Sequence, residues 1–232
     1  MYYLKGLCMQ RVEFLSNLPL FNGLSEKQLK LFAGLIREKE YDEGQFIVKD
    51  KDTIQSLCLI RSGRVKLSKY SRNGKEQIVH IYSEGEMLGL CTLFTSSLFP
   101  ANAVALEKTC VYTLSKDRLE HIAYNDQTFL LNLVFALSAR LAESMSMVES
   151  LSLKKADQRL SAFLLYSISM ADDTQMIRLP FSHQELSRML GVTPETLSRA
   201  FNRMKQEDII HMEGRSITIL DYSALKDIAE DF

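Results

Sequence analysis

The stretch SHQELSRMLGVTPETLSRAFNRMK, residues 182–205, decides the fold of the C-terminal part of this chain. Ser182 is followed three positions later by Glu185, the spacing of a capping box, which predicts that a short helix begins there. Gly191 can adopt the positive φ that commonly ends such a helix. Thr193 then precedes a proline, and this pair predicts the N-cap and the first residue of a second helix. Two short helices joined by a tight turn containing glycine make a helix-turn-helix.

The second predicted helix begins with polar residues where a buried helix would be apolar. Glu195, Ser198 and Arg199 share one helical face. In a helix-turn-helix, the N-terminal part of the second helix enters the major groove of DNA. There arginine can donate two hydrogen bonds to guanine, glutamate can accept one from cytosine, and serine can reach a base or a phosphate. The alternative is an i, i+4 ion pair between Glu195 and Arg199 on a solvated helix.

Residues 209–219, IIHMEGRSITI, alternate around Glu213-Gly214 and predict a two-stranded wing after the second helix. The net charge is −1, and residues 152–232 hold ten Lys and Arg against twelve Asp and Glu. No global positive field therefore attracts nucleic acid, and DNA binding would need a local basic face. We expect auxiliary or phosphate contacts from Thr193, Thr196, Arg203, Lys205 and Arg215.

A long helix is predicted before this domain, over residues 127–150, with Asp126 as its N-cap. Its residues follow a heptad pattern in which only Ser144 is polar, which favours a coiled-coil seam. The alternative is a single amphipathic helix packed on its own domain. A further helix is expected over residues 154–171, ended by Asp172-Asp173, with a short hinge at residues 151–153. The predicted dimer seam consists of Leu130, Val134, Leu137, Leu141, Val148 and Leu151.

The N-terminal half shows a different pattern. Ser25 and Gln28 have capping-box spacing and predict a helix that continues to about residue 36. Short strand-like runs then alternate with glycines, and Asn73-Gly74 between two of them is a strong hairpin signal. Short strands with a turn every 8–12 residues or so predict a small antiparallel barrel or roll. The runs are residues 45–48, 57–60, 65–70, 77–82 and 110–114.

Composition and motifs argue against several classes of protein. No apolar run reaches the roughly 18–20 residues of a membrane span, and residues 1–11 do not resemble a signal peptide, so we expect a cytoplasmic protein without a membrane partner. Widely separated cysteines argue against disulfides or a cysteine-ligated metal, and Cys58, Cys91 and Cys110 are expected to be buried apolar fillers. Nucleophile-elbow, zinc-protease, P-loop and Rossmann motifs are absent, so we do not expect an enzyme.

The sequence resembles the family named for the cyclic-AMP receptor protein and FNR. In the C-terminal domain the resemblance rests on VTPETLSR at residues 192–199, Ile209-Ile210 and GRSI at residues 214–217. The resemblance covers nearly the whole chain. Its N-terminal landmarks are Leu20-Phe21, Leu24-Ser25, Gly44, Gly63-Arg64-Val65-Lys66, Gly74-Lys75-Glu76-Gln77-Ile78 and Gly85-Glu86.

The resemblance implies an α+β fold in three parts. These are a cyclic-nucleotide-binding-like antiparallel β-roll that acts as sensor (residues 1–125), a long dimerisation helix (126–151) and a C-terminal winged helix-turn-helix (152–232). It implies a homodimer on double-stranded palindromic promoter DNA, with RNA polymerase as a further partner. The Glu195, Ser198 and Arg199 pattern is similar to the FNR type, which would make these residues the readers of TTGAT-type half-sites about one helical turn apart. A ligand-binding protein without DNA function is the alternative class, and the intact set of three argues against it.

The resemblance also argues against two classes of effector, cyclic nucleotides and an iron–sulfur cluster. Cyclic-nucleotide binders of the family clamp the phosphate with Arg-Ser-Ala, where this chain has Phe99-Pro100-Ala101, and the missing arginine argues against cyclic AMP. Only Cys8 lies near the N-terminus, which argues against an FNR-type iron–sulfur cluster and leaves Cys8 as a lone redox thiol. The resemblance places the effector pocket at Met87, Leu88, Gly89, Phe99, Pro100 and Ala101.

Residues 149–154 and the C-terminal domain are most similar to the nitric-oxide-responsive branch that regulates nitrate respiration and the hybrid cluster protein. Haem is therefore a hypothesis, and it needs an apolar pocket with an axial His, Met or Cys. A histidine in an apolar strand is more often a satisfied core residue than a ligand. A small organic ligand and cysteine oxidation are the alternatives. The axial candidates are His80, His121, Met87, Met145 and Cys91, of which the two histidines are weak candidates for binding a metal.

Overall fold

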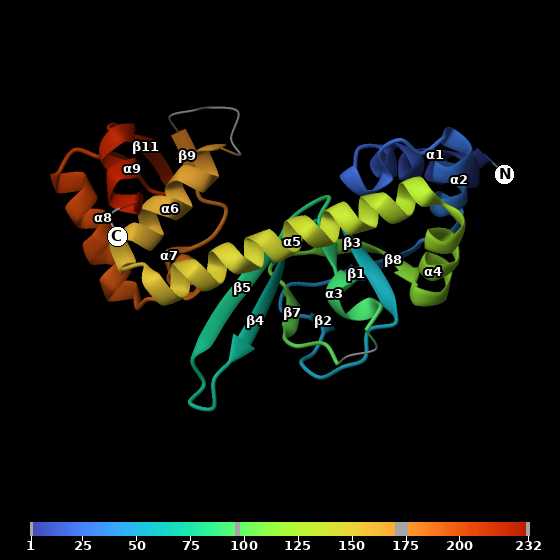
Figure 1. Cartoon of the computed structure of the whole chain (residues 1–232), viewed down its shortest axis with the longest axis horizontal. Helices are drawn as coiled ribbons and strands as arrows, with labels where there is room; N and C mark the ends of the chain where they lie inside the picture. Colours follow the sequence, from blue (N-terminus) through green and yellow to red (C-terminus); the bar gives the residue numbers. More distant parts are fainter. Residues whose placement is uncertain (1, 96–97, 170–175, 231–232) are drawn as a thin grey trace. The chain divides into compact units, whose positions relative to one another are not determined.

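The computed structural model describes residues 2–95, 98–169 and 176–230 (Figure 1). The chain forms two compact units. The N-terminal unit comprises Met1–Gly74 and Val79–Glu143, and the C-terminal unit comprises Lys75–Ile78 and Ser144–Phe232.

Three helices open the N-terminal unit: α1 (Tyr2–Ser16), the 3₁₀ helix η1 (Pro19–Phe21) and α2 (Glu26–Leu35). The predicted capping box at Ser25 is confirmed, because its side chain accepts from the Gln28 N–H and the Gln28 side chain accepts from the Ser25 N–H. The Phe32 ring lies 5.0 Å from the Phe21 ring and 4.8 Å from the Phe129 ring. This aromatic cluster joins the first helices to a helix a hundred residues further along the chain.

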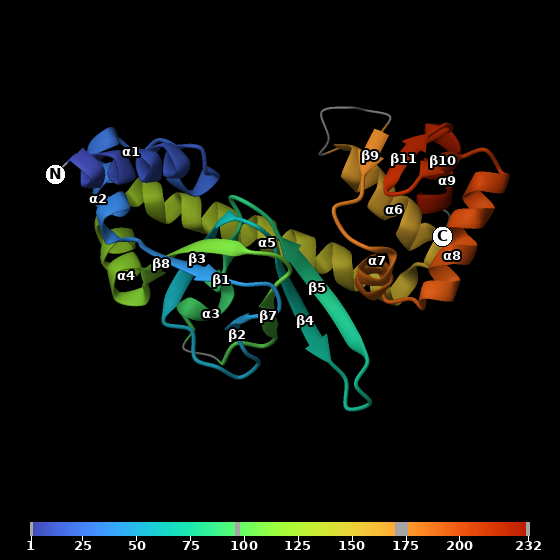
Figure 2. The ribbon, with the colours of Figure 1, turned by 180° about the vertical axis from the view of Figure 1, so that it is seen from behind.

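Two four-stranded sheets form the predicted roll (Figure 2). Their strand orders are β1-β8-β3-β6 and β2-β7-β4-β5. Antiparallel partners are distant in sequence: Arg37 of β1 lies opposite Thr113 of β8, and Ser56 of β3 lies opposite Ser115. The bounds are β1 (Arg37–Tyr41), β2 (Phe46–Val48), β3 (Ser56–Ser62), β4 (Val65–Tyr70), β5 (Glu76–Tyr82), β6 (Met87–Leu88), β7 (Asn102–Ala105) and β8 (Thr109–Ser115).

Four of the five predicted strand runs fall within observed strands, and the run 45–48 begins one residue before β2. β4 and β5 are neighbours joined through Gly74, as the hairpin signal predicted. The turn is wider than two residues, because the Gly74 N–H donates to the Ser71 carbonyl and β5 begins only at Glu76. The roll core lies between the sheets, where residues such as Leu57, Leu59 and Val111 are fully buried.

Three helices follow the roll strands or interrupt them: α3 (Leu90–Leu93), α4 (Lys116–Asn125) and α5 (Gln127–Leu153). The predicted cap of α5 is confirmed, since the Phe129 N–H donates to the Asp126 Oδ1 at 3.0 Å. The predicted hinge at residues 151–153 is wrong. These residues remain helical, and the break falls at Lys154-Lys155, where the Gln158 side chain accepts from the Lys155 N–H to start the next helix.

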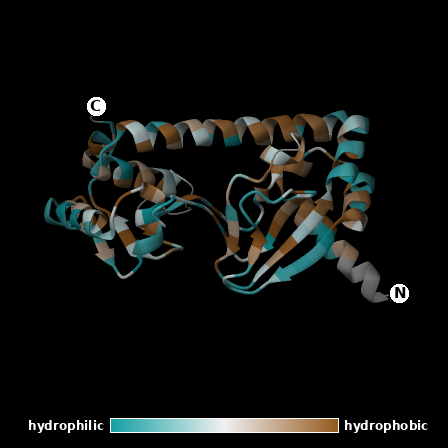
Figure 3. Cartoon of the chain, turned by 90° about the horizontal axis from the view of Figure 1, so that it is seen from below, coloured by the Kyte–Doolittle hydropathy of each residue, from teal (hydrophilic) through white to brown (hydrophobic). Residues whose placement is uncertain are grey.

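Among the described residues, α5 is the one helix whose length and composition would allow it to cross a membrane. Hydrophobic residues recur along its length (Figure 3). Arg140, Glu143 and Glu149 interrupt them, so no uninterrupted apolar run of that length exists. Charged side chains at the centre of a bilayer are costly, which favours another role for this helix.

The C-terminal unit is a helical domain with a small sheet in the order β10-β11-β9. The predicted wing is confirmed as a hairpin around Gly214, and β9 adds a third strand that the sequence pattern did not indicate. α6 is helical to Ser169, and the predicted stop at Asp172-Asp173 lies outside the described residues. The elements are α6 (Ala156–Ser169), β9 (Met176–Arg178), α7 (His183–Leu190), α8 (Pro194–Gln206), β10 (Ile210–Glu213), β11 (Ser216–Ile219) and α9 (Tyr222–Glu230).

Candidate DNA-binding surface and effector cavity

The α7–α8 pair has the local geometry that its sequence predicts. Ser182 and Glu185 form the capping box of α7, and Gly191 ends this helix in the left-handed region with φ 66°. Thr193 caps α8, accepting from the Thr196 N–H at 3.2 Å. Apolar side chains of α8, Leu197 and Phe201 among them, are buried against the rest of the domain. The opposite face of α8 is therefore left to solvent.

Glu195, Ser198 and Arg199 all lie on that exposed face, near the N-terminus of α8. The pKa of Glu195 is lowered, mainly by its own backbone N–H at the helix start, then by the Thr193 hydroxyl and the Arg199 charge. Glu195 is thus held as an ionised acceptor. The Arg199 guanidinium donates to Thr196 Oγ1 at 3.2 Å, and within the described part of the chain Arg199 makes no ion pair with Glu195. The alternative interpretation of the sequence, a simple i, i+4 ion pair, is not what the structure shows.

The predicted auxiliary residues differ in what they contact. Thr193 and Thr196 are used in the cap, with their hydroxyl oxygens 3.1 Å apart. Arg203 is bound by Glu207 at 3.0 Å and by Asp157 at 2.9 Å. Lys205 and Arg215 are exposed, and Arg215 lies beside Gly214 in the turn of the wing. Arg215 and Lys205 are therefore better placed for phosphate contacts than Arg203, whose charge is already neutralised.

The predicted seam residues form an exposed apolar stripe along α5. Leu137 is the least exposed of the five outermost side chains at 37%, Val148 is the most exposed at 65%, and Leu151 is half-buried. Only Phe129 and Leu133 of α5 are buried, on another side of the helix. One side of α5 therefore packs on its own domain, as the alternative interpretation predicts. The apolar stripe on α5 is not covered by that domain. Such a contiguous apolar surface marks an interaction site.

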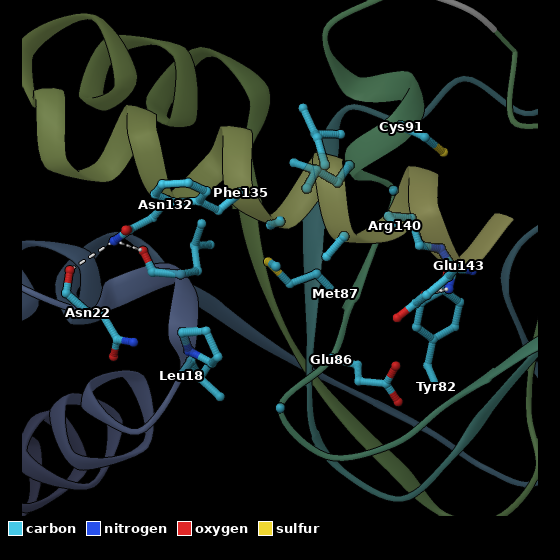
Figure 4. A pocket seen from close by; sticks show the side chains of 18 residues that line it. Leu18, Asn22, Tyr82, Glu86, Met87, Cys91, Asn132, Phe135, Arg140 and Glu143 are labelled. Carbon is cyan, nitrogen blue, oxygen red and sulfur yellow. Dashed lines mark hydrogen bonds and ion pairs between the residues drawn. The ribbon is translucent and has the colours of Figure 1, made fainter. Parts of the chain in front are cut away.

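A cavity of about 500 Å³ lies within the N-terminal unit, between α5, the η1 segment and the β5–α3 region (Figure 4). Met87 lies near its middle. Leu18, Asn22 and Asn132 lie toward one end, and Tyr82 lies with the charged groups toward the other. The α5 residues in its wall are Asn132, Phe135, Ala136, Leu137, Ala139, Arg140 and Glu143. A mostly apolar concave wall with a few convergent polar groups, at this size, is typical of small-molecule sites.

Arg140 organises the polar end of the cavity. Its guanidinium donates to Glu143 Oε2 at 2.7 Å and to the Tyr82 hydroxyl at 3.3 Å, and it lies over the Tyr82 ring. Burial raises the pKa of Tyr82 to about 12 against the opposing charge of Arg140. The hydroxyl therefore stays protonated at neutral pH and available as a hydrogen-bond donor.

Both ring nitrogens of His80 are occupied. Arg140 Nη1 donates to Nδ1 at 3.1 Å, so in the neutral ring Nε2 carries the proton and donates to Glu86 Oε1 at 2.8 Å. His80 matches the satisfied-histidine interpretation. His121 is exposed on α4 and lies outside the cavity wall. Among the described residues, no group of three or more His, Cys, Asp or Glu is arranged to hold a metal ion.

The residues predicted to line the effector pocket divide into two sets. Met87 and Gly89 are in the cavity wall, whereas Leu88, Phe99 and Ala101 are buried in the roll core and Pro100 is exposed. The wall residues outside the predicted pocket are Leu18, Pro19, Leu20, Asn22, Tyr82, Gly85, Glu86, Leu90, Cys91 and those of α5, and of these Cys91 was an axial-ligand candidate. A heptad pattern indicates only the seam side of α5, and nothing in the sequence links residues 18–22 with residues 132–143.

The cysteines also differ from expectation in one case. Cys58 and Cys110 are buried as predicted, and burial is the main cause that raises the pKa of each thiol to about 11. Cys91 is exposed and lies in the cavity wall, so the prediction of a buried filler is wrong there. It follows Gly89 and Leu90 at the start of α3, a short helix that leaves the thiol uncovered.

Two family models match this chain, one in its N-terminal half and one in its C-terminal part. Residues 158–228 match the Crp-like helix-turn-helix domain, and residues 38–126 match the cyclic nucleotide-binding domain. Transcriptional activator protein Anr of Pseudomonas protegens is 31% identical over 80% of this chain and 77% of its own length. The fumarate and nitrate reduction regulatory protein of Vibrio cholerae is 29% identical over 89% and 84%.

Solved structures show the same fold. FixK2 from Bradyrhizobium japonicum has a TM-score of 0.74 at 24% identity, covering 83% of this chain and 96% of its own. A CooA mutant from Carboxydothermus hydrogenoformans has a TM-score of 0.75 at 23% identity, covering 85% and 89%.

The fold and the exposed polar face of α8 define a DNA-binding protein of the winged helix-turn-helix class, with a roll of the cyclic nucleotide-binding type before it. The chain belongs to the Crp/Fnr family of transcription regulators.

Proposed function

We propose that this chain is a homodimeric, sequence-specific transcription regulator whose DNA binding is controlled by an effector in the cavity beside α5. Its parts are a sensory domain at residues 1–125, a dimerisation helix at residues 126–151 and a DNA-binding domain at residues 152–232. It acts in the cytoplasm on promoter DNA, with RNA polymerase as a further partner. The observation that carries the proposal is that α5 contributes both to the cavity wall and to the exposed apolar stripe, with Leu137 in both.

Helix geometry connects these two sides of α5. At 3.6 residues per turn, positions 132, 136, 139 and 143 lie on one side, and positions 130, 134 and 141 lie on the other. Leu137 belongs to the stripe and also reaches the cavity wall. A ligand in the cavity therefore touches the same rigid element that meets the second copy. An effector that binds one arrangement of the two long helices better than another shifts the population toward it. That shift sets the spacing of the two recognition helices on the palindrome.

The dimer is tested at Leu141, which is in the stripe and outside the cavity wall. Leu141→Asp places two carboxylates in an apolar seam and should convert the dimer to a monomer of unchanged helix content. Light scattering after gel filtration and circular dichroism measure both properties. Tyr124→Asp, an equally polar change at an exposed residue of α4, is the control. A dimer that survives Leu141→Asp places the interface elsewhere.

The base-reading role of Glu195, Ser198 and Arg199 is supported by their exposure on one face of α8 and by the ionised state of Glu195. Arg199→Ala should weaken operator binding by about 1–3 kcal/mol and relax the choice at one base pair of a TTGAT-type half-site. Fluorescence anisotropy with operator variants measures this change. Lys226→Ala, which removes an exposed charge on α9, is the control. Equal loss on operator and random DNA would instead make Arg199 a phosphate contact.

DNA binding itself separates this proposal from the alternative of a ligand-binding protein without DNA function. Counterion release makes the affinity of a genuine DNA-binding protein fall steeply with salt. A titration of operator affinity against salt concentration should give that steep slope. Absence of operator binding at low salt, with and without effector, would favour the alternative class.

For the effector, haem with nitric oxide is the first candidate, from the similarity of residues 149–154 to the nitric-oxide-responsive branch. Of the candidate axial ligands, only Met87 and Cys91 line the cavity, and both could hold iron through sulfur. His80 would first have to give up a hydrogen bond to Arg140 or Glu86. Bound haem would supply an iron atom that takes up nitric oxide, while Arg140 and Tyr82 offer hydrogen-bond donors at the polar end of the cavity.

An anaerobic absorption titration of the purified protein with haem, with and without nitric oxide, tests this candidate. A Soret band that saturates at one haem per chain and is lost in Met87→Leu or Cys91→Ser, while His121→Gln keeps it, supports haem sensing. Free-haem absorption alone would eliminate haem. The effector is then a small organic ligand in the same cavity, or the regulator responds to oxidation of a thiol such as Cys8.

A further inference from the structure

A second, smaller pocket lies in the N-terminal unit, apart from the effector cavity. It has a volume of about 220 Å³ and forms where α2 ends, β1 and β3 flank β8, and α4 begins. Figure 2 shows α2, α4, β1 and β8 at the same end of this unit. Apart from Leu35 its wall is polar, with three cations and three hydroxyls: Arg37, Lys39, Arg118, Ser56, Thr113 and Ser115.

The alternation of β1 explains why cations gather here without carboxylates. Successive side chains of a strand point to opposite faces. Arg37 and Lys39 therefore face the pocket, and Glu38 and Glu40 face away, where they lie within ion-pair distance of other cations at 3.8 Å and 3.3 Å. None of the pocket's three cations forms an ion pair with any carboxylate among residues 2–95, 98–169 and 176–230.

The hydroxyls come from paired strands and point to the same side of the sheet. Thr113 lies opposite Arg37, and Ser115 lies opposite Ser56. Thr113 is only 8% exposed and lines the pocket, and its hydroxyl donates to the Arg37 carbonyl at 3.2 Å. Since the Thr113 proton is already used, the hydroxyl donors available to a ligand are those of Ser56 and Ser115.

The Ser115 hydroxyl lines the pocket and makes no capping hydrogen bond to α4. This serine is the N-cap residue of α4, yet its side chain does not cap the helix. A serine at this position ordinarily satisfies a backbone N–H of the first turn. Here the hydroxyl lines the pocket instead, beside the positive end of a ten-residue helix.

The side chain of Arg118, on α4, is tied to the end of α2. Its guanidinium donates to the Leu35 carbonyl at 2.9 Å, which fixes one nitrogen and leaves the others for a ligand. A fork of this kind matches the oxygens of phosphate, and the charge-assisted hydrogen bonds it makes are short and strong.

We propose that this pocket binds a phosphate group, either as inorganic phosphate or as the phosphate ester of a small metabolite. Arg37, Lys39 and Arg118 supply the charge, and Ser56 and Ser115 supply hydroxyl donors. Bound phosphate ties the start of α4 to β1 and α2, immediately before the chain enters α5. The pocket thus gives the regulator a second input, which stands independently of the nature of the effector in the larger cavity.

The test uses the full-length protein in chloride buffer at constant ionic strength, with inorganic phosphate and glycerol 3-phosphate as probes. Isothermal titration calorimetry and the shift of the thermal unfolding midpoint report binding. Arg118→Gln and Arg37→Gln should each weaken phosphate binding by at least about tenfold. Lys27→Gln, which removes an exposed cation on α2 outside the pocket, should leave binding unchanged.

Ser115→Ala removes a donor without a change of charge or of a helix-capping bond, so it should weaken binding several-fold in a protein of unchanged stability. Tighter binding of glycerol 3-phosphate than of phosphate assigns the source to a phosphorylated metabolite, and the reverse order assigns it to free phosphate. Binding that is absent, or equal in all variants, overturns the proposal. So does a loss of transcription in Arg118→Gln without any phosphate binding, because the patch would then contact an acidic protein surface.

Discussion

The helix-turn-helix and the effector cavity are built from the chain in different ways. The residues of α7, the turn and α8 are consecutive, and each N-cap is satisfied by a partner three positions away. The cavity wall instead collects residues 18–22, 82–91 and 132–143, which meet only after the roll and α5 have packed. Function in the first region therefore depends on local geometry, and function in the second depends on long-range packing.

Substitutions should therefore differ in their effect between the two regions. Local caps contribute about 1 kcal/mol each, whereas removal of a large side chain from a core shared by distant segments costs several times more. The C-terminal recognition element should tolerate the loss of a single local bond. The N-terminal unit should be sensitive at the few aromatic contacts that join its distant parts.

Phe32→Ala is the strongest test of this difference. The Phe32 ring is 1% exposed and packs on Phe21 and Phe129, so its removal leaves a cavity between α2 and the start of α5. We expect a loss of about 3–5 kcal/mol in the free energy of unfolding of the N-terminal unit. Chemical denaturation followed by tyrosine fluorescence measures it. A loss below 1 kcal/mol or so would mean that the aromatic cluster does not join these segments.

Thiol reactivity sharpens the contrast between the roll core and the cavity wall. Burial raises the pKa of Cys58 to about 11 from 9.0, which lowers its thiolate fraction at pH 8 about a hundredfold, whereas Cys91 is exposed. Iodoacetamide at pH 8 should therefore label Cys91 at least about a hundredfold faster than Cys58. Peptide mass spectrometry gives both rates, and an effector in the cavity should protect Cys91. Equal rates would contradict the described burial.

Alanine substitutions at Gly63 and Gly214 allow the roll and the wing to be compared directly. Gly63 of the roll has φ +84°, and a Cβ there would lie 2.5 Å from Thr109 Oγ1 and 2.7 Å from the Lys108 carbonyl. Gly214 of the wing has φ +60° with open space around it. Gly63→Ala should cost about 1–3 kcal/mol more than Gly214→Ala, which carries the backbone strain alone. Thermal unfolding of both variants measures the difference in stability. Equal destabilisation would mean that close packing does not restrict position 63.

Ser182→Ala is expected to have the smallest effect. It removes the side-chain half of the α7 capping box and should lower stability by about 1 kcal/mol, with operator affinity nearly unchanged because α8 keeps its own cap. Denaturation and anisotropy measure the two quantities. A cost larger than that of Phe32→Ala would reverse the comparison between the two regions.

The features that the sequence predicts correctly are those set by residues close together in the chain. The capping boxes at Ser25 and Ser182, the Asp126 cap and the wing turn at Gly214 all depend on residues within a few positions of one another. The strand runs were found for the same reason, because alternation is a local property. The family relationship also follows from local motifs around Glu195, Ser198 and Arg199.

Features that depend on distant partners were missed or misplaced. The heptad pattern of α5 identifies the exposed stripe and gives no sign that Arg140, on the other side, meets Tyr82 and His80. The exposure of Cys91 follows from the short helix α3, which no periodicity indicates. The third strand β9 is three residues long and gains its hydrogen bonds only from β11.

The order of the elements, the helix-turn-helix and the residues exposed at the start of α8 therefore follow from the sequence alone. Capping, turn formation and alternation act over a few residues, and these interactions are written directly in the chain. Only the tertiary structure decided which side chains line the effector cavity and which cations gather around Thr113 and Ser115. Those sets come from segments far apart in sequence, and sheet register and helix packing alone bring them together.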